Sequence, residues 1–205
     1  MDQTLINPDW PYCDSSAPNS ISGEKDACGV GFLAQIEGKK SNWVLKQALR
    51  GLSCMEHRGG CGGDSDSGDG AGILCEIPWD FFKSIWPSAN QAKIEFAGLG
   101  MIFMPREAEK RKEAKNFCEE EARNLGLISL GWRDVPVNSS VLGKLARDNA
   151  PHIEQWIVEG TQKGDELERL LFRLRRRIGE RTRNAWGNDS IDLYIASLSN
   201  RTIVY

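Results

Sequence analysis

The first apolar run of the chain is Cys28-Gly29-Val30-Gly31-Phe32-Leu33-Ala34-Gln35-Ile36. Its length and its small residues favour a buried strand. The stretch before it, residues 1–27, has three prolines, many Ser and Asn residues and no hydrophobic period. Such a composition is typical of an extended leader without a core of its own. The sequence therefore predicts a boundary at Cys28, with a propeptide-like leader over 1–27 and a folded domain over 28–205.

Downstream of this run, the pattern alternates between helical and strand-like segments. The spacing of apolar residues predicts a helix over 41–53, capped by Ser41 or Asn42 and packed on the first strand. Glycine and aspartate dominate residues 55–72, which indicates a functional loop. Further strands are predicted at 73–77, 99–104, 127–137 and 153–158, and further helices at 78–82, 106–125 and 139–147.

The C-terminal part is predicted to be a long helix followed by a hairpin. Asp165, with Glu168 three residues later, resembles a capping box, and leucines recur on one face of the segment that follows. The hairpin would pair 191–198 with 202–205 across a turn at Ser199. Because the chain ends within that last strand, we expect it to be part of a longer polypeptide.

Composition excludes several functional classes. The 205 residues include 26 Lys and Arg against 29 Asp and Glu, a net charge of −3, and 40% are hydrophobic. A domain of this size buries roughly 70% of its unfolded surface. The near-balanced charge disfavours a strongly basic nucleic-acid binder. No apolar run has the length of a membrane span. Without an export signal, the six cysteines are expected to be free thiols in a reducing compartment such as the cytoplasm.

A run of arginines stands out in the last predicted helix: Arg173, Arg175, Arg176, Arg177, Arg181 and Arg183. Such a run can bind a polyanion. A solvated helix face beside Glu166, Glu168 and Glu180 is the favoured interpretation.

The sequence contains two candidate metal sites. Residues 64–70 resemble a calcium loop, but the obligatory glycine position would be Asp69 and the last ligand position Cys75. A zinc site would use Cys54, His57, Cys61 and Cys75, whose spacing is irregular. We therefore predict no metal, with a zinc-stabilised domain as an alternative.

Cys28 has the chemistry of a self-sufficient nucleophile. If the leader were removed, Cys28 would carry a free α-amine with a pKa of about 8, which is a usable base near neutral pH. A thiol with its own amine as base needs no histidine. From its position alone, however, Cys28 is predicted to be a small buried residue on an edge strand.

Four motifs favour the nucleophile over the structural role of Cys28: Cys28-Gly29-Val30-Gly31-Phe32, Met55-Glu56-His57-Arg58-Gly59-Gly60, Ser67-Gly68-Asp69-Gly70-Ala71-Gly72-Ile73-Leu74 and Ile77-Pro78-Trp79-Asp80-Phe81-Phe82. Together they resemble the class II, N-terminal-cysteine glutamine amidotransferase segment of glutamate synthases, the ferredoxin-dependent type more closely. The resemblance implies an α+β fold, the four-layer αββα sandwich of N-terminal-nucleophile hydrolases, here partial. It also implies that Cys28 is the mature N-terminus and attacks the side-chain amide of L-glutamine.

The resemblance also implies roles for a few other residues. Arg58 and Gly59 would support the nucleophile, and Asp69 and Gly70 would form the wall of the cleft. The family's oxyanion-hole and substrate-holding groups correspond to positions beyond Tyr205, so the chain alone is expected to be a poor glutaminase. FMN, an iron–sulfur cluster and ferredoxin would belong to the full-length parent, in the cytoplasm or the plastid stroma. A non-catalytic module that binds or assembles with other chains is the alternative function.

Overall fold

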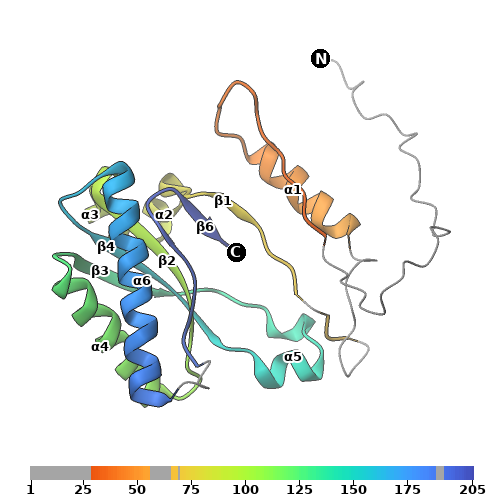
Figure 1. Ribbon diagram of the computed structural model, residues 1–205. Helices are drawn as coiled ribbons and strands as arrows, with labels where there is room; N and C mark the ends of the chain where they lie inside the picture. The colour runs from red at the N-terminus through yellow and green to blue at the C-terminus, as the bar shows by residue number, and fades with distance from the viewer. Residues whose placement is uncertain (1–28, 56–65, 69, 188–191) are drawn as a thin grey trace, which may run out of the picture.

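The computed structural model describes residues 29–55, 66–68, 70–187 and 192–205. Helices and antiparallel strands alternate along these residues, so the predicted α+β class is confirmed (Figure 1). The elements are α1 (Asn42–Cys54), β1 (Leu74–Glu76), α2 (Trp79–Ile85), α3 (Pro87–Gln91), η2 (Ile94–Phe96), β2 (Ala97–Met104), α4 (Ala108–Asn124), β3 (Ile128–Asp134), η3 (Ser139–Val141), α5 (Lys144–Asn149), β4 (His152–Glu159), α6 (Gly164–Trp186), β5 (Tyr194–Ser199) and β6 (Thr202–Val204).

A four-stranded antiparallel sheet in the order β3-β4-β2-β5 forms the centre of the molecule. β2 pairs with β4 along its whole length, from Ala97 opposite Glu159 to Met104 opposite His152. Almost every β2 residue is buried, because helices or strands cover both of its faces. A strand buried on both faces has a nearly continuous apolar sequence, which is the pattern of β2.

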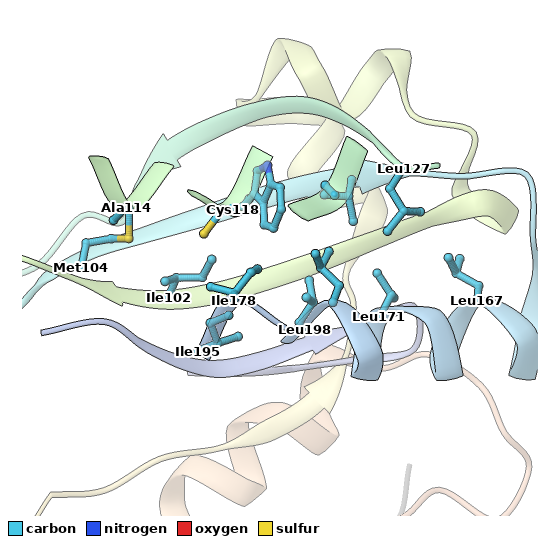
Figure 2. Close-up of a cluster of buried hydrophobic side chains, with 14 residues drawn as sticks. Ile102, Met104, Ala114, Cys118, Leu127, Leu167, Leu171, Ile178, Ile195 and Leu198 are labelled. Carbon is cyan, nitrogen blue, oxygen red and sulfur yellow. The ribbon is translucent and has the colours of Figure 1, made fainter. Parts of the chain in front are cut away.

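The helices α4 and α6 cover one face of this sheet (Figure 1). Figure 2 shows their side chains meeting those of β2 and β5 in one apolar cluster, with Ile178 of α6 close to Ile102 of β2. Close contact is possible at Gly98, where a Cβ atom would lie 2.5 Å from Leu171 Cδ1. Gly126 lies just after the end of α4, and its φ of +76° lets Leu127 N–H donate to Ala122 C=O in a Schellman turn.

The other face of the sheet packs against α2, α3 and β6. One buried cluster contains Phe82 of α2, Trp86 directly after that helix, Ile203 of β6, and Leu99 and Ile157 of the sheet. β6 pairs with β1 in a separate two-stranded sheet, with Cys75 opposite Ile203.

The predicted C-terminal hairpin is wrong. A turn does lie between β5 and β6, but β5 pairs with β2 in the larger sheet, whereas β6 pairs with β1. Serine side chains on β5 take the place of hairpin bonds, since Val204 N–H donates to Ser197 Oγ and Thr202 N–H to Ser199 Oγ. The turn was visible in the sequence, but the choice of sheet depends on partners far away in the chain.

The predicted strand after Cys28 is also absent from the described residues. Residues 29–36 have no strand hydrogen bonds, and Val30, Phe32 and Ile36 are at least 90% exposed. Helix α1 forms where predicted, and Ser41 Oγ accepts a hydrogen bond from Trp43 N–H. It has no buried residue, so the expected packing on the strand is not present. A strand needs a neighbour for its backbone groups, and no described strand lies beside this segment.

The long helix α6 forms as predicted but begins differently. Its N-cap is Lys163, and the capping-box role of Asp165 is wrong because that side chain pairs with Arg201. Glu168 instead accepts hydrogen bonds from Ser199 Oγ and Asn200 N–H at the turn after β5. None of the described helices has an apolar stretch sufficient to cross a membrane.

The glutamates predicted to accompany the arginine run are not its partners. Arg177 Nε lies 2.7 Å from Glu121 Oε2, and Arg181 pairs with Glu120 and Glu121. Both glutamates lie on α4. These pairs join the two helices that cover the sheet, because α4 presents its acidic residues along the flank of α6. The remaining arginines of the run form no ion pair with Glu166, Glu168 or Glu180 in the described part of the chain.

Candidate functional site

One of the five predicted site residues can be placed. Cys28, Arg58, Gly59 and Asp69 lie outside the described residues, so their roles stay predictions. Gly70 is exposed with a φ of +98°, a backbone conformation that favours glycine. Of the alternative zinc set, Cys54 and Cys75 are described, whereas His57 and Cys61 are not.

The segment that leads to Gly70 is anchored against α5. Ser67 is 5% exposed, and its Oγ accepts a hydrogen bond of 3.0 Å from Ala146 N–H. Gly143 lies directly beneath this segment, and a Cβ there would come within 2.4 Å of Ser67 Oγ and 2.6 Å of Asp66 C. The two backbones can therefore meet only because residue 143 has no side chain.

The segment that follows Gly70 is anchored against the end of the chain. Ile73 and Tyr205 exchange two backbone hydrogen bonds of 2.8 Å, which extend the β1–β6 pairing by one residue. A Cβ at Gly72 would lie 3.0 Å from Tyr205 C=O, so this approach is close as well. Gly70 thus lies on a short stretch held at both ends by residues far away in the sequence.

A polar cluster lies beside this second anchor. Gln155 is 1% exposed and its Oε1 accepts a 2.6 Å hydrogen bond from Arg133 Nη1, its neighbour across the β3–β4 pair. The Tyr205 phenol hydrogen-bonds to Gln155 in turn. Burial, reinforced by the nearby Cys75 thiol, raises the pKa of Tyr205 to about 12. Burial likewise raises the pKa of Cys75. The Tyr205 phenol and the Cys75 thiol are therefore neutral near pH 7.

Sequence reasoning did not single out this cluster. Arg133, Gln155 and Tyr205 belong to β3, to β4 and to the residue after β6. Their meeting depends on strand register and on β6 leaving the hairpin, and neither is encoded locally. The available signal was the polar pair Glu154-Gln155 directly before the apolar residues Trp156, Ile157 and Val158 of β4.

A second titratable cluster joins Asp134, His152 and Glu154. His152 Nε2 lies 2.9 Å from Asp134 Oδ1 and 3.2 Å from Glu154 Oε1. Three such groups can hold a metal in principle. Glu154, however, is 1% exposed and already faces two cations, Lys115 Nζ at 2.6 Å and Arg111 Nε at 3.8 Å. Because these cations neutralise the buried carboxylate, the arrangement suits an ion-pair network better than a divalent ion.

The described cysteines lie apart from one another. Cys54 is exposed at the end of α1, Cys75 is half-buried on β1, and Cys118 is fully buried on α4, where burial strongly raises the pKa of its thiol. An iron–sulfur cluster needs several thiolates at one place. The described residues therefore do not fit such a cluster.

Comparisons with known proteins identify the family of this chain. The family model described as glutamine amidotransferases class-II matches residues 28–205. Ferredoxin-dependent glutamate synthase 2 of Synechocystis sp. is 46% identical over 187 residues, which are 89% of this chain and 12% of that protein. The chloroplastic/mitochondrial enzyme 1 of Arabidopsis thaliana is 45% identical over 192 residues, and that of Pyropia yezoensis 43% over 199.

Each of these relatives is much longer than the chain, which spans 12% of their length. The similarity nevertheless covers 89–94% of the chain itself. It includes β1, the four-stranded sheet and both of the helices that cover it, all of which lie within residues 28–205. The chain therefore belongs to the class II glutamine amidotransferases.

Proposed function

We propose that this chain supplies the glutamine-hydrolysing segment of a ferredoxin-dependent glutamate synthase. The observation that carries the proposal is the family match, which begins at Cys28 and continues to Tyr205. The starting position supports a processed chain in which residues 1–27 are a leader and Cys28 is the N-terminal residue. The relatives with 40–46% identity support the synthase as parent.

The proposed reaction uses the Cys28 thiolate as nucleophile and its own α-amine as base. The sulfur attacks the side-chain carbonyl carbon of glutamine, and the amine delivers the thiol proton to the leaving nitrogen, so ammonia departs. A thioester between Cys28 and the glutamyl group remains. Water then adds to the thioester carbonyl, the C–S bond breaks, and glutamate leaves with a regenerated thiol. Arg58 would favour the thiolate by its charge, and Gly59 would orient the amine.

The anchored residues on either side of Gly70 support a cleft wall there. The stretch between Ser67 and Ile73 is fixed by the Ser67–Ala146 bond at one end and by the Ile73–Tyr205 pair at the other. Anchored residues on either side of a binding loop lower the ordering cost of binding. Asp69 and Gly70 would then form a preformed edge of the glutamine site.

The layered arrangement supports the four-layer αββα sandwich as the complete fold. α4 and α6 form one helical layer over the four-stranded sheet, and β1 and β6 begin a second sheet on the opposite face.

The parent enzyme would combine the released ammonia with 2-oxoglutarate and reducing equivalents from ferredoxin. FMN and an iron–sulfur cluster would serve that reductive step in the full-length parent enzyme. Relatives named as chloroplastic support a plastid location, with the cytoplasm as the alternative.

A second candidate is a non-catalytic module that assembles with other polypeptides. The exposure of Val30, Phe32 and Ile36, together with a helix α1 that buries no residue, favours it. In this case the fold would be retained, while the nucleophile would lack a packed strand to position it.

Mass spectrometry of the intact protein separates the two candidates. The purified chain is incubated with 6-diazo-5-oxo-L-norleucine, a glutamine analogue with an electrophilic carbon, and its mass is measured before and after. Loss of residues 1–27 and one adduct on Cys28 would support the amidotransferase. Cys118→Ala, which removes a buried thiol, should label as well as the original chain, whereas Cys28→Ala should not label. An unprocessed chain without selective labelling of Cys28 would favour the non-catalytic module.

A further inference from the structure

The outward face of α6 carries a stripe of arginines with one aromatic residue among them. Arg169, Arg173, Arg176 and Arg183 are exposed, and Phe172 between them is 63% exposed. They lie on the side of the helix opposite its buried residues, Leu167, Leu171, Leu174, Ile178 and Thr182. At 1.5 Å per residue the stripe is about 21 Å long. We call these five residues the basic stripe. Figure 1 shows α6 lying over the sheet beside α4.

The arginines of α6 divide into two groups with different surroundings. Arg177 and Arg181 are fixed by Glu120 and Glu121 of α4. Within the described part of the chain, the arginines of the basic stripe form no ion pair. Ion pairs with α4 therefore account for Arg177 and Arg181. They do not account for the arginines of the basic stripe.

Like charges are neighbours in the middle of the basic stripe. Arg169 and Arg173 are four residues apart, and Arg173 and Arg176 three apart, so like charges are neighbours on the surface. Each such pair destabilises a helix. The helix dipole favours cations only in the last turn, and of the basic stripe only Arg183 lies there. An opposite charge supplied from outside would offset this repulsion.

We propose that the basic stripe is a docking surface for a separate acidic protein. Arginine and large aromatic residues are enriched at protein interfaces, where an arginine can bind a carboxylate with two parallel hydrogen bonds. A nucleic acid fits less well, because its continuous phosphate backbone cannot avoid Glu166 and Glu180 on this face, whereas a protein can place its carboxylates beside the arginines alone. A membrane surface fits less well too, since Phe172 is the only large apolar residue of the stripe.

Fluorescence anisotropy tests the proposal on the full chain. The probe is a labelled helical peptide with Glu at every third or fourth position, titrated at low and at high salt. Arg169→Gln, Arg173→Gln and Arg176→Gln are combined in one variant. The matched control combines Lys46→Gln, Arg50→Gln and Lys112→Gln, which removes the same charge from α1 and α4. Circular dichroism checks that both variants retain the helical content of the original chain.

The expected result is at least a tenfold weaker affinity for the peptide in the stripe variant, with little change in the control. Phe172→Ala should weaken binding as well, because the aromatic ring lies between the arginines. Equal losses in both triple variants would overturn the proposal, since they would show only a response to net charge. Tighter binding of single-stranded DNA or of anionic vesicles than of the peptide, or no binding of the peptide, would also overturn it.

Discussion

Ile73 and Tyr205 exchange two backbone hydrogen bonds of 2.8 Å, so the last residue of the chain fixes the start of β1. The neighbouring Cys75–Ile203 pair places a fully buried isoleucine beneath this connection. The position of the segment around Gly70 thus depends on side chains of β6. This dependence gives the first of four predictions.

Ile203→Ala should lower the free energy of unfolding by about 2–5 kcal/mol, because it leaves a cavity in the cluster beneath β6. Urea denaturation measures the change. Leu74→Ala on the paired strand removes a side chain that is 64% exposed, so its effect should stay within about 0.5 kcal/mol. Equal effects of the two substitutions would contradict the packing of β6 described above.

Gly143→Ala should displace the segment before Gly70. The added Cβ would meet Ser67 Oγ at 2.4 Å and two backbone atoms of 66–67 within 2.7 Å, and backbone cannot move aside as a flexible side chain can. Overpacking of this kind costs about 1–3 kcal/mol, which thermal unfolding would detect. Gly51→Ala on α1 has no atom within 4 Å of its Cβ and should leave stability unchanged or increase it.

Glu154→Gln should destabilise the fold by about 1–3 kcal/mol, because Lys115 and Arg111 lose a buried carboxylate. A double-mutant cycle with Lys115→Met measures the coupling, which we expect to be about 0.5–3 kcal/mol. Asp134→Asn serves as the control, because this side chain is 77% exposed and surface pairs contribute about 0–1 kcal/mol. A coupling near zero would mean that the Lys115–Glu154 pair contributes nothing to stability.

Stability should fall between about pH 10 and pH 12 because of Tyr205. The phenol has a pKa of about 10 when unfolded and about 12 when folded. In this range the unfolded chain releases a proton that the folded chain retains, so unfolding becomes more favourable as pH rises. Denaturant midpoints measured across the range should show the loss. Tyr205→Phe should reduce it, while Tyr194→Phe, which alters an exposed ring, should not. An unchanged pH profile in Tyr205→Phe would contradict the burial of this phenol.

Elements whose stability is local and periodic could be predicted from the sequence. α4 and α6 were recognised because their apolar residues recur at helical spacing, and β4 because its apolar run is short. These signals lie within one segment and depend on no distant partner.

Elements that need a distant partner could not be predicted. The turn after Ser199 resembles a hairpin turn, yet Ser197 and Ser199 bind the N–H groups that a hairpin partner would take. The capping role expected for Asp165 fails for the same reason, since Arg201 beyond the turn pairs with it. In both cases a contact across the fold replaces the local one.

The candidate site was predictable only through its motifs. The glycine preference at residue 70 is explained by its φ of +98°, whereas the Arg133–Gln155–Tyr205 cluster depends on the register of β3 against β4 and on the route of β6. No spacing rule connects residues that meet in this way.

The pairing of β6 with β1 has a consequence for the order of folding. All four strands of the larger sheet, and both helices over it, come from the continuous stretch 97–199. β6 must instead find a strand more than half a chain earlier, and closing so long a loop carries a large entropic cost. We therefore expect the larger sheet to form first and β6 to add last. In the native protein, the β1–β6 pair should be the first part to open. Hydrogen exchange at Ile73 and Tyr205 should therefore precede exchange within β2, because this local opening leaves the larger sheet folded.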